Sequence, residues 1–274
     1  MTVLTRSGDK VFRFAIIAIA ALAFFELILP LASVIWVSFF ENKIINFPPK
    51  GYTFDWYRNA WSMPRFRDGF VMSIKVGVVA TSVSMLVGVP AAIFLARTKF
   101  WGRELIQTVL LGPLIVPGIV AGSALFMFLI EFEVFTGVQV AQTFGGLCLA
   151  HSLIALPWTI RLVTASLVGM NQQVEEAAAT MGARPLTVFR RVTLPGIRPG
   201  IFAGGLFAFV ISFVDLEKSL FLVGPGSTTL PIAIINYLEW SIDPTIAAVA
   251  TVQIAAIALV MIITDRFFKL TRAF

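Results

Sequence analysis

The chain has 274 residues, of which 58% are hydrophobic and only 13% charged, and its formal net charge at pH 7 is +6. A soluble domain carries roughly 25% charged and about 45–50% apolar residues, so this composition excludes a soluble enzyme, a disordered tail and a secreted disulfide module. The chain is predicted to lie in a lipid bilayer, where cytoplasmic loops account for a basic excess without any nucleic-acid partner.

Six segments are long and apolar enough to cross a bilayer as helices, which takes roughly 20 residues each. They run over Phe14–Phe40, Val71–Ala96, Leu105–Ile130, Phe144–Ile160, Ile201–Val223 and Thr245–Thr264. The runs are too long and continuous for barrel strands, which alternate over about 10 residues. The sequence therefore predicts an all-α membrane protein with six transmembrane helices.

The first segment follows a basic tail, as the apolar region of a signal peptide does. It is longer than such a region and no small-residue cleavage site follows it, so we interpret it as a retained signal-anchor helix. It contains Glu26, and an ionisable side chain within a span is a functional candidate.

In the third segment, Pro113 and Pro117 predict a kink. In the fourth, His151 has no partner at metal-ligand spacing and is predicted to be a packed, hydrogen-bonded side chain.

The distribution of basic residues predicts the orientation. Fourteen lysines and arginines fall on the side of the amino terminus, including Lys10, Lys269 and Arg272, and five fall on the opposite side. Because cytoplasmic loops carry the basic excess, both termini are predicted to be cytoplasmic. We expect residues 1–70 to form the cytoplasmic tail, first helix and outer loop, and residues 71–274 to form a core of five helices.

A cytoplasmic loop at about residues 166–200 has the local signals of two short helices at the membrane surface. Asn171 is a suitable N-cap for the first helix, and Gly182 stands where a left-handed C-terminal cap is needed. Pro185 suits the first turn of the second helix, and Pro195 is predicted to end it. On composition alone, the stretch is equally an amphipathic connector that lies on lipid headgroups.

The residue spacing in this loop resembles a known signature. Glu176-Ala177-Ala178 is followed after three residues by Gly182, and after nine more by the run Val192–Pro195. The EAA loop of ABC-importer permeases reads E-A-A-x-x-x-G, nine residues, then I-x-L-P. This chain departs from that pattern only at Val192, which replaces the isoleucine. The loop also lies between the fourth and fifth spans on the cytoplasmic side, as in that family. The chain is thereby identified as a member of the binding-protein-dependent type I family, with a resemblance that covers about residues 71–274.

The resemblance implies the type I ABC-importer permease fold and a place in the bacterial inner membrane. In that family, two permeases form a pseudo-symmetric pair, a dimer of ATP-binding cassette subunits sits beneath them, and a solute-binding protein delivers the cargo. The implied partners are therefore the ATPase dimer, a second homologous permease in a heterodimer, a solute-binding protein and membrane lipid. The sequence has no G-x-x-x-x-G-K-[ST] loop, so no cofactor is expected in this chain, and ATP and Mg²⁺ are expected on the partner ATPase.

The resemblance also assigns roles to single residues. The part of the loop around the signature would be the coupling helix, which docks on the ATPase and transmits its closure to the membrane helices. The residues to which it assigns ATPase coupling are Glu176, Ala177, Ala178, Gly182, Ala183, Pro185 and Leu186. The chain would then be a non-enzymatic subunit driven by ATP hydrolysis on another polypeptide.

The fifth segment contains a late group of charged residues, Asp215, Glu217 and Lys218. In a continuous helix, Asp215 and Lys218 share a face and can pair, whereas Glu217 points elsewhere and stays unpaired. Together with Glu26, these residues are the candidates for contact with cargo in the translocation pathway. The alternative is that Lys218 extends outward to the interface and the acids meet the outer loop.

The same stretch resembles the polyamine and opine branch of these permeases. The resemblance rests on Ser212–Asp215, Ser219–Phe221, Gly224-Pro225 and Leu230-Pro231. Val214 replaces an acid of that branch, and Glu217 and Lys218 replace apolar residues. A mixed acid-and-lysine site suits an amino acid-like or opine-like zwitterion as well as a polyamine, so the predicted cargo is a small organic solute of one of these kinds.

Three other classes of membrane protein fit the sequence less well. An intramembrane enzyme would need a nucleophile–base pair or metal ligands, and one histidine, one cysteine and no H-E-x-x-H motif do not supply them. An ion-coupled secondary carrier normally shows internal repeats and helices broken at the midplane, and neither is visible in this sequence. A passive channel differs from the importer interpretation only in having no use for an ATPase-docking loop.

Overall fold

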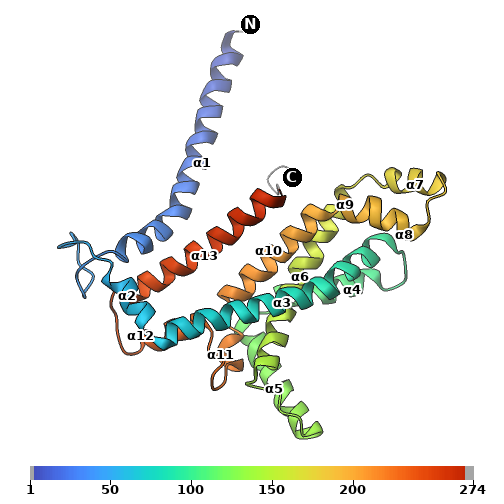
Figure 1. Ribbon diagram of the computed structural model, residues 1–274. Coiled ribbons are helices and arrows are strands. Elements are labelled where there is room, and N and C mark those ends of the chain that lie inside the picture. The colour runs from blue at the N-terminus through green and yellow to red at the C-terminus, as the bar shows by residue number, and fades with distance from the viewer. Residues whose placement is uncertain (1–2, 269–274) are drawn as a thin grey trace. The chain divides into compact units, whose positions relative to one another are not determined.

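The computed structural model describes the backbone of residues 3–268 and the side chains of residues 12–267 (Figure 1). Lys269, Arg272 and the side chain of Lys10, which contribute to the predicted orientation, lie outside the described residues. The described chain is helical and has no β-strand beyond an isolated bridge between Phe40 and Tyr52. Its elements are α1 (Val3–Val37), α2 (Asp55–Ser62), α3 (Pro64–Arg97), α4 (Arg103–Leu111), the 3₁₀ turn η1 (Gly112–Leu114), α5 (Gly118–Thr136), α6 (Phe144–Gly169), α7 (Gln172–Thr180), α8 (Pro185–Val188), the π-helix η2 (Phe189–Thr193), α9 (Leu194–Gly196), α10 (Arg198–Val214), α11 (Ser219–Leu222), α12 (Leu230–Leu238) and α13 (Thr245–Phe268).

Five described helices are long and apolar enough to cross a membrane. They are Phe12–Val37, Pro64–Arg97, Gly118–Thr136, Phe144–Gly169 and Thr245–Phe267. A sixth span is present if the bent pair Pro185–Gly196 and Arg198–Val214, which meet at 62°, counts as one crossing. The all-α prediction is confirmed, with five to six helices that can span.

The predicted continuous third helix, Leu105–Ile130, is wrong. Helix α4 ends at Leu111, a 3₁₀ turn follows, and α5 begins only at Gly118. Pro113 and Pro117 cause the interruption, because a proline has no N–H to donate and its ring clashes with the carbonyl of the preceding turn. Pro117 adopts an extended ψ of 133° and starts the new helix. The chain therefore has a full break where the prolines predicted a kink.

The chain divides into two compact units. One consists of residues 1–62 and 238–254. In this unit the described side chains of α1 are almost all exposed, and the loop after α1 is held by aromatic contacts, including an edge-to-face pair of Trp36 and Phe40. The amide of Asn59 donates to the hydroxyl of Thr245 at 3.0 Å, which ties α2 to the start of α13.

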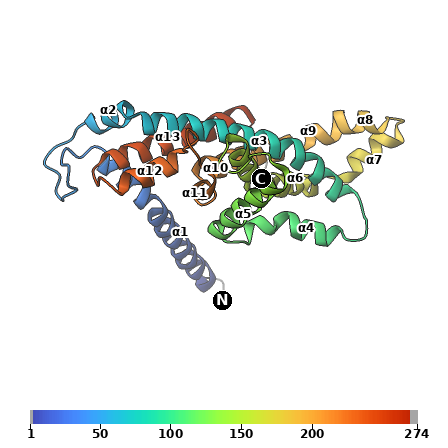
Figure 2. The same cartoon turned by 90° about the horizontal axis from the view of Figure 1, so that it is seen from below.

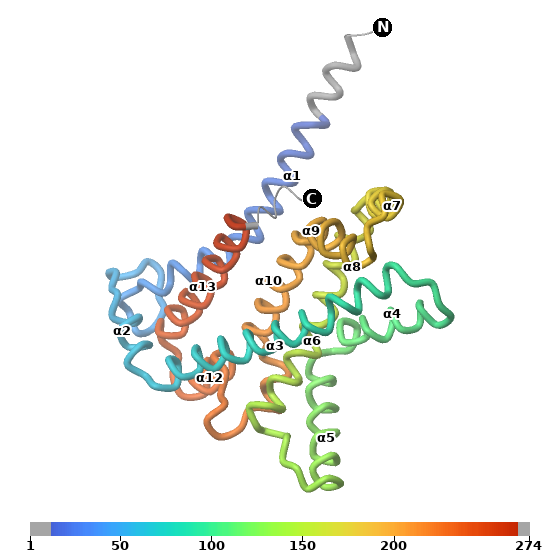
Figure 3. Tube along the Cα trace, turned by 45° about the vertical axis from the view of Figure 1, so that its right-hand side comes forward, coloured from blue at the N-terminus to red at the C-terminus, as the bar shows by residue number. Residues whose placement is uncertain are grey.

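The other unit consists of residues 63–237 and 255–274, and its centre is formed by α3, α6 and α10, which pack against one another in pairs (Figures 1 and 2). One apolar cluster, which contains Ala92, Ile160, Val163, Leu167 and Ile197, joins α3, α6 and the start of α10. A second cluster joins α3, α5, α6 and α11 around Leu147 and Leu222. Helices α7 and α8 lie side by side, beyond the carboxyl end of α6 and the amino end of α10 (Figure 1). They are beside the last turn of α3 (Figure 3).

Candidate functional site

The predicted cytoplasmic loop folds as two short helices, and we call residues 171–188 the α7–α8 loop. The Asn171 side chain accepts a hydrogen bond from the backbone N–H of Gln173 at 3.0 Å, so the predicted N-cap is confirmed. Gly182 has φ of +84°, and the N–H of Ala183 donates back to the carbonyl of Ala178 at 3.2 Å. This is the left-handed helix end that the sequence predicts, and it favours glycine because other residues are strained there. Helix α8 begins at Pro185, as expected.

The prediction that the second helix ends at Pro195 is confirmed to within one residue. Helix α8 runs on through the π-helix η2 into α9, which ends at Gly196. The N–H of Leu194 donates to the carbonyl of Phe189, five residues earlier. The wider π-turn shifts the hydrogen-bond register just before Pro195, and one residue after it the helix ends and the chain bends by 62° into α10.

The α7–α8 loop presents large apolar side chains among its exposed polar residues. Met181 is 83% exposed and Leu186 is 59% exposed. Of the seven residues to which the family resemblance assigns coupling, five are exposed, namely Glu176, Ala177, Gly182, Pro185 and Leu186, while Ala178 and Ala183 are half-buried. The structure therefore brings all seven together in one short loop. Small alanines beside exposed apolar side chains are suited to close contact with another protein.

The predicted fifth helix, Ile201–Val223, also contains a break. Helix α10 ends at Val214, and Asp215 is extended, with ψ of 120°. The Asp215 carboxylate accepts hydrogen bonds from the backbone N–H groups of Lys218 and Ser219 at 3.0 and 3.2 Å. A short acidic side chain that captures nearby N–H groups ends one helix and begins another turn, which here is α11.

The three charged residues at this break form one ionic group. Lys218 Nζ lies 3.3 Å from Asp215 Oδ1 and 3.6 Å from Glu217 Oε2. The predicted pairing of Asp215 with Lys218 is confirmed, whereas the prediction that Glu217 stays unpaired is wrong, because the break turns its carboxylate toward Lys218. The side chains of Asp215 and Lys218 are 6% and 12% exposed, while that of Glu217 is 50% exposed.

His151 of α6 completes a polar cluster with these residues. Its ring nitrogens hydrogen-bond the hydroxyls of Ser212 and Ser219 at 2.8 and 3.0 Å, and its Nε2 lies 3.9 Å from Asp215 Oδ2. The ring is 1% exposed, so the predicted packed histidine is confirmed. We call His151, Asp215, Glu217 and Lys218 the charge cluster. Among the described residues, no group of three or more His, Cys, Asp and Glu side chains is placed to hold a metal ion.

The charge cluster lies where both interrupted segments meet. The Glu217 carboxylate lies directly against Gly118, the first residue of α5, where a Cβ would force that flexible side chain to move. The expectation that the spans contain no broken helices is therefore wrong, and broken helices at a solute site are typical of secondary transporters, so this feature no longer argues against an ion-coupled carrier. Sequence reasoning identified the charges but not this meeting of two breaks.

Glu26 is not part of the charge cluster as the structure describes it. It lies on α1, in the other compact unit, and its side chain is exposed. Its predicted contact with cargo therefore stays a prediction.

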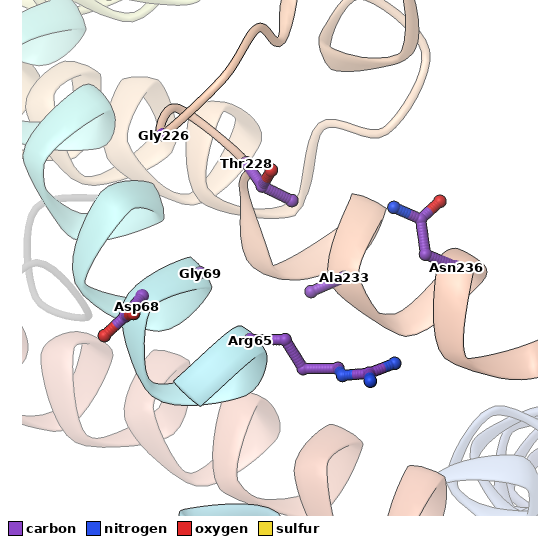
Figure 4. A pocket seen from close by; sticks show the side chains of 7 residues that line it. All are labelled: Arg65, Asp68, Gly69, Gly226, Thr228, Ala233 and Asn236. Atoms are coloured by element: carbon purple, nitrogen blue, oxygen red, sulfur yellow. The ribbon is translucent and has the colours of Figure 1, made fainter. Parts of the chain in front are cut away.

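A separate pocket of about 490 Å³ lies between the first turns of α3 and the segment that leads into and through α12 (Figure 4). Its polar lining residues are Arg65, Asp68, Thr228 and Asn236. Figure 4 shows the side chains of Arg65 and Asn236 on one side, whereas the Asp68 carboxylate points away from them. Arg65 also lies over the ring of Tyr237, 5.7 Å from its centroid. The polar groups do not converge, so the pocket has no ligand assignment.

Comparison with known proteins identifies the family. Residues 88–272, which include the α7–α8 loop and the charge cluster, match the family described as binding-protein-dependent transport system inner membrane component. The chain belongs to this family. Its members are the permeases of ABC transporters, which are non-catalytic subunits, and the chain is therefore a transmembrane permease subunit of such an importer.

Individual relatives support the same assignment. The putrescine transport system permease PotI of Escherichia coli K12 is 28% identical over 245 residues, which are 89% of this chain and 87% of the relative. The spermidine/putrescine permease PotC of Haemophilus influenzae is 29% identical over 215 residues, 78% and 81% of the two chains. The molybdenum permease ModB of Mycobacterium bovis is 29% identical over 221 residues, 76% and 83% of the two chains.

Two solved importers share the fold. A chain of a bacterial alginate ABC transporter gives a TM-score of 0.71 at 14% identity, over 95% of this chain and 98% of the other. A chain of the MetNI methionine transporter in an inward-facing form gives a TM-score of 0.62 at 17% identity, over 76% and 96% of the two chains. The permease fold predicted from the signature in the α7–α8 loop is thus confirmed.

Proposed function

We propose that this permease subunit forms half of the translocation pathway of an ATP-driven importer in a bacterial inner membrane, with both termini cytoplasmic. Its second half is a homologous permease, in a heterodimer. A separate dimer of ATP-binding cassette subunits binds ATP and Mg²⁺, and a solute-binding protein delivers the cargo. The observation that carries this proposal is the α7–α8 loop, where most of the signature residues are exposed beside the large apolar side chains of Met181 and Leu186.

The α7–α8 loop is suited to transmit force from a partner subunit. It is compact because both of its helix starts and the turn between them are fixed by the Asn171 cap, the left-handed Gly182 and Pro185. A rigid projecting element transmits force, whereas a flexible connector absorbs it. The exposed side chains of Met181 and Leu186 would be covered by the ATPase, which gives a physical reason for apolar surface outside the bilayer.

The charge cluster supports a cationic cargo. Asp215, Glu217 and Lys218 together have a formal charge of −1, because two carboxylates share one ammonium group. A second ammonium group, supplied by a polyamine, would complete the pairing of the half-exposed Glu217 carboxylate. PotI and PotC are named as permeases for putrescine and spermidine, whereas ModB is named for molybdenum. Of these cargoes, the cluster's charge favours the polyamine over an anion.

Uptake of radiolabelled putrescine tests the proposed function. Cells or proteoliposomes that contain the permease pair, the ATPase and the binding protein are expected to lose at least about 90% of uptake on addition of vanadate, which blocks ATP-driven cycling. The matched control is the same preparation without the binding protein, which should show background uptake only. Vanadate-insensitive uptake would instead indicate a passive channel or an ion-coupled carrier. Uptake of molybdate in place of putrescine would overturn the cargo assignment alone.

A further inference from the structure

Glu175, the neighbour of the signature residue Glu176, joins three segments that are far apart in sequence. Its Oε2 lies 2.9 Å from Nη2 of Arg97, the last residue of α3. Its Oε1 accepts a hydrogen bond of 2.5 Å from the hydroxyl of Thr193, in the π-helix η2. One carboxylate therefore holds the end of α3, the first turn of α7 and η2 together. We call these three residues the Arg97–Glu175–Thr193 junction.

The junction is sheltered from water. The side chains of Arg97 and Glu175 are 26% and 15% exposed, and Thr193 is 5% exposed. Ion pairs on an open surface contribute little, because water and salt screen them. Here one oxygen of the carboxylate accepts the Thr193 hydroxyl and the other pairs with the Arg97 guanidinium, and partial desolvation strengthens both contacts. The contact is therefore suited to keep α7 and α3 together while the loop is moved.

Directly beyond the junction, α3 is embedded in packed apolar residues. Ala92, about one turn before Arg97, contacts the cluster that contains Ile160 and Val163 of α6 and Ile197 before α10. A close-packed core moves as a unit, since its side chains have little free volume. A displacement of Arg97 is thus passed to α3 and to the helices packed on it.

The two adjacent glutamates have different surroundings. The Glu176 side chain is exposed on the face proposed to meet the ATPase, whereas Glu175 turns inward to its own chain. We propose that the Arg97–Glu175–Thr193 junction is the positioning contact that transmits displacement of the α7–α8 loop to helix α3. This inference rests on the proposed function of the loop as the ATPase contact. It adds a role for residues outside the signature.

A reporter at the far end of α3 tests transmission without any knowledge of the cargo. Asp68, near the start of α3, has a side chain that is 70% exposed, so a cysteine at this position can react with a membrane-impermeant maleimide. The one native cysteine, Cys148, is buried and is replaced by alanine in this background. The permease is assembled with its ATPase and partner permease, and the labelling rate at position 68 is measured with and without ATP and vanadate.

In the otherwise wild-type complex, ATP and vanadate are expected to change the labelling rate about fivefold or more, in line with ordinary coupling strengths. R97Q and E175Q should each remove most of this change, while the ATPase still co-purifies. The reversed pair R97E/E175R should restore it. The matched control is K99Q, which removes an exposed cation two residues from Arg97 and should respond like the wild type.

Retention of the full response by R97Q and E175Q, or no recovery in the reversed pair, would overturn the inference. If R97Q, E175Q and the reversed pair do not accumulate in the membrane, T193V tests the proposal in their place. Valine keeps the buried shape of Thr193 and removes only the hydroxyl. T193V should reduce the response by about half, and an unchanged response would contradict the proposal. Failure of the ATPase to co-purify with the wild-type chain would refute the proposed function instead.

Discussion

Replacing Gly182 with glutamate is expected to lower ATP-driven uptake by roughly 100-fold, within the usual range of coupling free energies, while the permease still reaches the membrane. Gly182 has φ of +84°, which costs any other residue about 1–2 kcal/mol. No described residue lies within 4 Å of its Cβ position, so a glutamate side chain would project outward from the loop. It would place charge and bulk beside the exposed Met181, on the surface proposed to meet the ATPase. Uptake and ATP hydrolysis, measured on the same proteoliposomes, check this prediction.

Gly102→Glu is the matched control for this change. Gly102 has φ of +86°, and again no described residue lies within 4 Å of its Cβ position. The backbone strain is therefore the same, but Gly102 precedes α4 and is outside the α7–α8 loop. Uptake by this variant should stay within about threefold of wild type. Equal losses in both variants would show that strain alone is responsible and would contradict a docking role for Gly182.

The second large effect is expected at Asp215. Its replacement by alanine should lower the free energy of unfolding by about 3–5 kcal/mol, because the largely buried ammonium of Lys218 loses its nearer partner. The change also removes the acceptor for the N–H groups of Lys218 and Ser219 at the start of α11. Thermal unfolding of the purified complex, followed alongside its uptake of putrescine, measures the effect.

Two further variants distinguish the effect of D215A on stability from its effect on putrescine uptake. D215A/K218M removes the orphaned ammonium and should recover much of the stability, though not the uptake. E217Q changes the charge of the cluster by the same amount as D215A, but at a side chain that is 50% exposed, so it should alter stability by less than about 1 kcal/mol. It should nevertheless weaken putrescine uptake. Normal uptake by both D215A/K218M and E217Q would show that the charge cluster does not contact the cargo.

Much of the fold could be predicted from the sequence, because its signals are local. The positions of four of the six predicted spans follow from apolar run length, and the starts of α7 and α8 and the end of α7 follow from residues with strong backbone preferences, Asn171, Pro185 and Gly182. The family signature depends on residue spacing alone, and it predicts the permease fold without knowledge of any contact. These features need no knowledge of what packs against them.

The two breaks could not be predicted, because hydropathy does not report where a helix stops inside an apolar run. Asp215 ends α10 by capturing N–H groups that a continuous helix would have used, and only the fold shows that it does so. Pro113 and Pro117 were visible, but whether prolines bend or interrupt a helix depends on the neighbouring elements. Pro195 marked a helix end correctly, but the π-turn just before it carries no signal in the sequence.

The Arg97–Glu175–Thr193 junction was missed for a related reason. Helical periodicity places Glu175 and Glu176 about 100° apart around α7, yet it does not indicate which of them faces the rest of the chain. The signature drew attention to Glu176, whereas the structure places Glu175 on Arg97. Contacts between residues so distant in one sequence carry no local signal.

The central claim is that the α7–α8 loop contacts the ATPase, and site-specific photo-cross-linking tests it most directly. A photoreactive amino acid is placed at Leu186, which is 59% exposed, in the assembled importer in membranes. The control position is Phe135, which is 91% exposed at the end of α5, on the side predicted to face outward. We predict a cross-link to the ATP-binding subunit from position 186 and none from position 135. Cross-links from position 186 to lipid alone, with the ATP-binding subunit present in the complex, would contradict the account.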